Sequence, residues 1–111
     1  MRALPDQASL AQQPSARGAI DLATIRRHLA AKATDFEHCY DVQRLARADL
    51  AGTVEATFTI GADGEVTAVT AAGLLPELED CIAARFRRIT FPASRRGDTT
   101  VIWPFHFKPS R

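Results

Sequence analysis

Two cysteines, Cys39 and Cys81, are the most reactive side chains in this sequence, and their spacing limits what they can do. Neither belongs to a CxxC pair or has a flanking Cys, so the four ligands of a structural zinc site are missing. Each falls beside apolar residues of a predicted helix, and the two helices can turn both sulfurs toward a shared seam. The residues leave open a disulfide or two buried, inert thiols, and no metal site is expected.

His38 stands next to Cys39, with Asp35 one turn earlier, an arrangement that suggests a nucleophile and its base. Neighbouring positions on a helix point about 100° apart, however, so His38 and Cys39 do not face each other. His28 and His106 have no partners at the spacing of metal ligands, and the sequence holds no glycine-rich phosphate loop. We therefore expect no catalytic site, no metal and no cofactor.

The basic residues are most concentrated near the end of the last predicted helix and in the loop after it. They are Arg85, Arg87, Arg88, Arg95 and Arg96. Interleaved aromatic residues make RNA binding an alternative here. The simpler interpretation is a solvated helix end and a polar loop, with the aromatic residues in the core. A net charge of +1 gives no long-range attraction for nucleic acid, which is not expected as a partner.

The length and composition fit one modest domain. The chain has 111 residues, of which 46% are hydrophobic and 24% charged, as in globular proteins. No apolar run approaches the roughly 18 residues that a membrane span needs, and the N-terminus lacks the apolar segment of a signal peptide. We expect no direct membrane insertion by this chain; if the domain is exported, we expect the targeting signal to lie outside it.

The first part of the chain differs in composition from the rest. Residues 1–18 are rich in Ala, Gln, Ser and Pro without sustained periodicity, which predicts a flexible arm or linker. The folded domain is predicted to span residues 19–108.

A helical pattern begins after Asp21, a suitable N-cap residue, because apolar residues then recur at steps of three and four. Thr34 and Glu37 have the spacing of a capping box, which leaves open a second helical segment that starts at Phe36. The helical pattern is expected to end by Gly52.

A change to alternating residues follows. Apolar and polar residues alternate from Thr53 to Ile60, then Asp63-Gly64 suits a tight turn, and Glu65 to Ala71 supplies a returning strand. This pattern predicts a β-hairpin with one apolar face.

A second helix is predicted after Gly73, with Pro76 in its first turn, and the segment from Thr99 to Phe107 alternates again. The order α-β-β-α-β predicts an α+β fold with two layers. We expect a three-stranded sheet of antiparallel type with its helices on one face.

In this order the motifs resemble the TonB C-terminal fold, and within it the AgmX/PglI C-terminal domain family. The matching positions are Cys39-Tyr40, Gly52, Val54, Phe58, Ile60, Asp63-Gly64, Val66, Cys81, Phe91-Pro92 and Pro104-Phe105-His106-Phe107. The resemblance extends from about Ile20 to Phe107.

The resemblance implies a non-catalytic, protein-binding domain of the bacterial cell envelope, of an energy-transducing or gliding-motility type, with envelope proteins as partners. An oxidising periplasm or envelope would favour the disulfide between Cys39 and Cys81. The tyrosine-proline motif with which TonB recognises receptors has no counterpart between Arg44 and Ala51. Receptor energisation itself is therefore not expected.

The last strand is an edge of the sheet in the TonB fold, which implies that it can accept an extended partner segment by β-augmentation. The predicted partner-binding residues are Thr99, Thr100, Val101, Ile102 and Trp103, with flanking polar contacts from Arg95, Arg96 and Asp98. Trp103 and Phe105 are expected to serve mainly as core residues, and Pro104 limits how far an added strand can pair. The alternative is a homodimer formed through the same edge.

Overall fold

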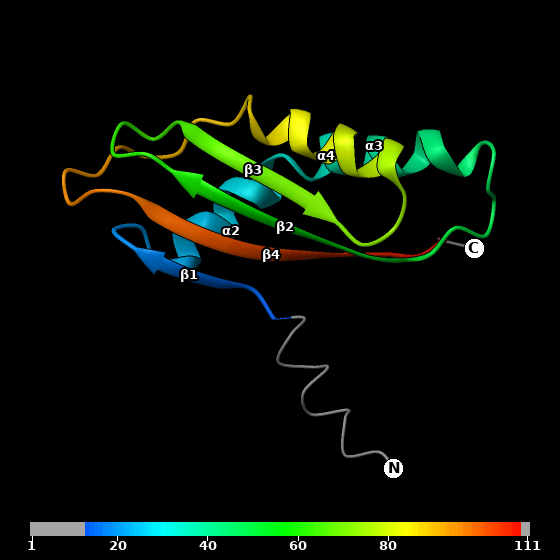
Figure 1. Cartoon of the computed structure of the whole chain (residues 1–111), viewed down its shortest axis with the longest axis horizontal. Helices are drawn as coiled ribbons and strands as arrows, with labels where there is room; N and C mark the ends of the chain where they lie inside the picture. Colours follow the sequence, from blue (N-terminus) through cyan, green and yellow to red (C-terminus); the bar gives the residue numbers. More distant parts are fainter. Residues whose placement is uncertain (1–12, 110–111) are drawn as a thin grey trace, which may run out of the picture.

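Residues 13–109, which the computed structural model describes, form one antiparallel sheet and three helices (Figure 1). The elements are β1 (Ser15–Gly18), α2 (Leu22–Ala31), α3 (Ala33–Arg44), β2 (Gly52–Ile60), β3 (Val66–Ala72), α4 (Pro76–Phe86) and β4 (Thr99–Phe107). The predicted α+β class is confirmed. The hairpin, α4 and β4 lie where the sequence pattern places them.

The sheet has four strands in the order β1-β4-β2-β3, so the prediction of three strands is wrong. The additional strand, β1, comes from the end of the segment that was predicted to be a flexible arm, and it pairs with β4 from Ser15↔Ile102 to Gly18↔Thr99. Its four residues carry no alternating pattern, and its backbone hydrogen bonds go to a strand far along the chain. Residues 1–12 of the predicted arm lie outside the described residues.

The β2–β3 hairpin closes on a glycine that no other residue can replace without strain. Gly64 has φ +93°, and a Cβ atom there would lie 2.0 Å from the carbonyl oxygen of Phe91. The backbone N–H of Phe91 donates to the carbonyl of Gly64 at 2.8 Å. The segment between α4 and β4 is thereby fixed against the hairpin turn.

The helical region divides into α2 and α3 at Lys32, not at Phe36. Lys32 supplies no side-chain cap to α3, so the capping box expected from Thr34 and Glu37 does not start this helix. At the other end of α2, the predicted N-cap is confirmed, because Asp21 accepts a hydrogen bond from the N–H of Thr24 at 3.0 Å.

The core lies between the helices and one face of the sheet. The apolar residues of β2 are buried there, while its threonines and Glu55 face the other side. Phe86 of α4 has its ring centroid 4.4 Å from that of Phe58 and 5.0 Å from that of Phe36 on α3. Phe36 in turn lies 4.8 Å from Phe105 of β4. These aromatic contacts join α3, α4, β2 and β4 into one core.

Replacing Asp21 with alanine is expected to lower the melting temperature at neutral pH, and this difference should become smaller in acid. Hydrogen bonds from the hydroxyl and the backbone N–H of Thr24 hold the pKa of Asp21 below its ordinary value of 3.8. A carboxylate with a lowered pKa stabilises the folded state above the unfolded pKa, and loses this effect as the pH falls through the folded value.

Thermal melts of the native protein and of Asp21→Ala from neutral pH to below the folded pKa of Asp21 measure this effect. Asp21→Asn is the matched control, because an amide caps the helix without titrating. A deficit of the alanine variant that stays constant into acid would contradict the role of the ionised carboxylate.

Candidate binding site

The two halves of β4 have different surroundings. From Thr99 to Ile102 the strand lies between β1 and β2, whereas from Trp103 to Phe107 it pairs with β2 alone among the described residues. The prediction that β4 is a free edge from Thr99 onward is therefore wrong for its first four residues, because β1 occupies that side. Of the five residues predicted to bind a partner, only Trp103 belongs to the open half.

Pro14 limits the length of β1 within the described part of the chain. It directly precedes the first paired residue, Ser15, and proline has no N–H to donate to a neighbouring strand. The chain bends at Gln13. Within residues 13–109 no strand pairs with the outer side of β4 from Trp103 to Phe107, and we call this segment the open half of β4.

Replacing Gly18 with alanine is expected to detach β1 from β4. Gly18 has φ +133°, and a Cβ atom there would lie 2.2 Å from the carbonyl oxygen of Asp98. Faster hydrogen exchange of the Thr99–Ile102 amides that donate to β1 would report the detachment. Gly97→Ala is the control, because Gly97 also has a positive φ, +114°, but no atom within 4 Å of an added Cβ. Unchanged protection in Gly18→Ala would refute the prediction.

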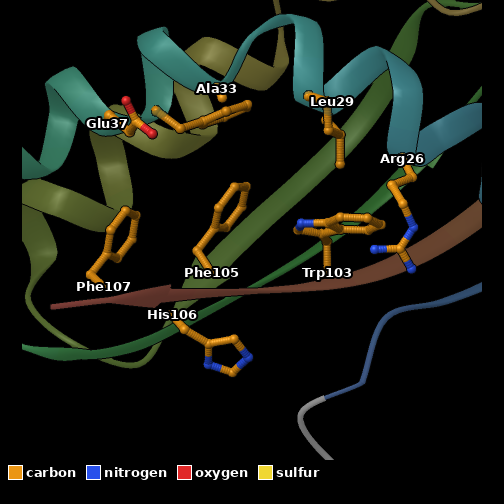
Figure 2. Close-up of a pocket in the computed structure, with 10 residues that line it drawn as sticks. Arg26, Leu29, Ala33, Glu37, Trp103, Phe105, His106 and Phe107 are labelled. Carbon is orange, nitrogen blue, oxygen red and sulfur yellow. The ribbon is translucent and has the colours of Figure 1, made fainter.

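A groove of about 290 Å³ runs between the open half of β4 and the junction of α2 and α3 (Figure 2). It is lined by Arg26, Leu29, Ala30, Ala33, Phe36, Glu37, Trp103, Phe105, His106 and Phe107. This volume is near the lower end of the range for ligand pockets, roughly 300 to 1,000 Å³, and it suits a few side chains.

Alternate residues of β4 form the floor of the groove. Trp103, Phe105 and Phe107 point toward the helices, whereas the ring of His106 points to the other face of the sheet (Figure 2). There Nδ1 of His106 lies 3.0 Å from the hydroxyl of Thr53. The three aromatic side chains are half-buried and pack against the core. They therefore contribute to the core and also line the groove. The expectation that Trp103 and Phe105 serve mainly the core misses their exposed part.

The helical side of the groove includes the short side chains of Ala30 and Ala33 and the ring of Phe36. At one end the guanidinium of Arg26 lies over the indole of Trp103, with its carbon 5.2 Å from the ring centroid. Glu37 stands at the other end, near Phe107 (Figure 2). The groove is therefore apolar along its length, with a cation at one end and a carboxylate at the other.

The predicted flanking residues lie elsewhere. Arg95, Arg96 and Asp98 are exposed in the loop before β4, at the end of the strand that β1 covers. They do not line the groove. Sequence reasoning identified the strand but missed the residues on its helical side, because nothing in the sequence indicates that the α2–α3 junction lies over Phe105.

The structure brings Cys39 of α3 and Cys81 of α4 together, with 2.00 Å between their sulfur atoms. Cys39 is fully buried and Cys81 half-buried. A bond at this place joins α3, which carries Phe36 and Glu37, to α4. It therefore holds one wall of the groove in position.

None of the described helices is long and apolar enough to cross a membrane. Comparisons with protein-family models, curated proteins and solved structures found no match to this chain. We therefore describe the fold by its geometry alone. Its described residues form a four-stranded antiparallel sheet and three helices, with a groove beside the open half of β4.

Proposed function

We propose that this domain binds an extended segment of another protein along the open half of β4. The observation that carries the proposal is the coincidence, at Trp103–Phe107, of an apolar groove and a strand side that pairs with none of the residues 13–109. An added strand would find backbone partners in β4 and a place for its alternate side chains under α2 and α3. This combination of main-chain pairing and side-chain pockets is how domains recognise peptides by β-augmentation.

The partner segment would form few hydrogen bonds. Pro104 has no N–H, which suits a strand side that faces outward but removes one donor from the open half. Side chains in the groove would therefore supply much of the affinity. The resulting interaction would be short and dependent on the aromatic residues of β4.

We also place the domain in the periplasm or envelope, in a system of the TonB-like, energy-transducing or gliding type. The motif order that resembles the TonB C-terminal fold supports this proposal, as does the pairing of Cys39 with Cys81. Disulfides persist in oxidising compartments and are rare in the cytosol.

Binding fits the groove better than catalysis does. The lining includes one carboxylate, Glu37, and one imidazole, His106, and the imidazole points to the opposite face of the sheet. A general base must come within hydrogen-bond reach of the proton that it removes. These two groups cannot serve one substrate in the groove together.

Selection of displayed random peptides on the immobilised domain tests the proposal. The selected peptide should change the fluorescence of Trp103, the single tryptophan of the chain, and should shift backbone resonances from Trp103 to Phe107. Ala30→Leu, which fills the groove, is expected to weaken binding by about tenfold or more. Ala31→Leu is the matched control, because Ala31 is the next exposed residue of α2 and does not line the groove.

Binding that Ala30→Leu leaves unchanged, or shifts confined to the far side of the helices, would refute the proposal. Sedimentation at several concentrations addresses the alternative of a homodimer. A concentration-dependent dimer that Ala30→Leu abolishes would show that a second copy, and not another protein, occupies the open half.

A further inference from the structure

The face of the sheet opposite the core carries threonines on neighbouring strands. Residues that pair across antiparallel strands lie on the same face, so the register places Thr57 and Thr59 of β2 there together with Thr100 of β4. Ile102, which is 36% exposed, stands among them and pairs with Thr57 on one side and with Ser15 on the other. The centre of this face is therefore an aliphatic side chain surrounded by hydroxyl groups.

Within the four strands, the permanent charges of this face stand on opposite sides of Ile102. Arg17 of β1 pairs with Thr100, which precedes Ile102 by two residues. Glu55 of β2 pairs with Pro104, which follows Ile102 by two residues. Both charged side chains are exposed. Each lies one strand and two residues away from Ile102, in opposite directions, so Ile102 marks the midpoint of a diagonal of about 16 Å between them.

This arrangement is complementary to itself. Consider a two-fold axis in the plane between two such faces, which passes over Ile102 at right angles to the diagonal. It brings Arg17 of each copy over Glu55 of the other, and Ile102 over Ile102. Thr57 then meets Thr100 of the other copy, and hydroxyl groups face hydroxyl groups. The strands of the two sheets cross at roughly 70°, nearer to orthogonal than to aligned sheet packing.

The size of the face sets the strength of such a contact. Four strands about 4.8 Å apart and about seven residues long cover roughly 19 by 23 Å. This area is smaller than the roughly 800 Å² that each partner contributes to a standard stable interface. The contact is therefore weak, with dissociation at micromolar concentration or above.

We propose that the partner of this face is a second copy of the chain, in a two-fold dimer centred on Ile102, with Arg17 of each copy against Glu55 of the other. A partner of one charge would satisfy one of these residues and repel the other, whereas a second copy satisfies both. The dimer goes beyond peptide binding and does not depend on it, because the groove lies on the helical side of the sheet. Each dimer would present two grooves.

Sedimentation from low micromolar to near-millimolar concentration tests the proposal. The native protein should form a dimer. Arg17→Glu and Glu55→Arg should each weaken it by about tenfold or more, because each change places like charges together at two symmetric positions. Arg47→Glu is the matched control, since it makes the same change of charge between α3 and β2, outside the sheet. Ala30→Leu should also leave the dimer intact, which distinguishes it from a dimer formed through the open half of β4.

Mixing the two reversed variants gives a sharper result. An Arg17→Glu chain and a Glu55→Arg chain place opposite charges together at both positions, so their mixture should form a dimer although neither variant does so alone. The double variant Arg17→Glu/Glu55→Arg should associate with itself about as well as the native protein. This recovery would show that the single variants lose the contact and not the fold.

A native protein that stays monomeric at near-millimolar concentration would overturn the proposal. A dimer that both single variants retain would overturn it as well, and so would a mixture of the two variants that remains monomeric. None of these outcomes bears on peptide binding in the groove, which the peptide selection tests separately.

Discussion

Replacing Phe86 with alanine is expected to lower the free energy of unfolding by about 3 to 5 kcal/mol. The Phe86 side chain is fully buried, and its ring meets those of Phe58, Phe36 and Phe105 at centroid distances of 4.4, 5.0 and 5.9 Å. The loss is a large part of the roughly 5 to 15 kcal/mol that stabilises a typical domain.

Urea denaturation measures this loss as a lower midpoint with an unchanged slope. Arg87→Ala is the control, since Arg87 is the exposed neighbour and its truncation should change stability by less than about 0.5 kcal/mol. A loss below about 1 kcal/mol for Phe86→Ala would contradict the central position that the structure gives to this ring.

Removing the bond between Cys39 and Cys81 is expected to lower the free energy of unfolding by roughly 4 kcal/mol in the chain-entropy model. The two residues are 42 positions apart, and a cross-link over that distance restricts the unfolded chain strongly. The melting temperature should fall by roughly 15 to 30 °C, because about 1 kcal/mol corresponds to 4 to 8 °C in a domain of this size. Cys39→Ala/Cys81→Ala is the variant to measure, beside the native protein with and without reductant.

Thiol titration of the unfolded, unreduced native protein is the direct control for this prediction. It should find no free thiol, and reduction should lower native stability toward that of the double alanine variant. Two free thiols would show that the bond does not form in the protein as it exists. Reductant that leaves stability unchanged would show that the bond does not support the fold.

The parts of this fold that the sequence predicts are those with local patterns. Alternation predicts β2 and β4, Pro76 marks the first turn of α4, and Asp21 is the N-cap of α2 as expected. Each depends on residues within a few positions of one another. The resemblance to the TonB C-terminal fold depends on loose motifs in a fixed order, and it stays a prediction.

The parts that the sequence does not predict depend on distant contacts. Residues Ser15–Gly18 form β1 only because β4 supplies their partners and because the N–H of Ile20 donates to the buried hydroxyl of Thr99 at 2.9 Å. The groove depends on Ala30 of α2 and Phe105 of β4 lining the same hollow, a relation that neither segment contains alone. The correction to the binding edge follows from β1, which moves the open side of β4 to Trp103 and beyond.

Amide hydrogen exchange along β4, with and without the selected peptide, tests the central claim most directly. In the free protein the outward amides from Thr99 to Ile102 should be protected by β1, and the amide of His106, the outward donor beyond Pro104, should exchange fast. Bound peptide should slow exchange at His106 and leave the first group unchanged. Peptide binding that leaves the His106 amide as fast as before would contradict strand addition at the open half of β4.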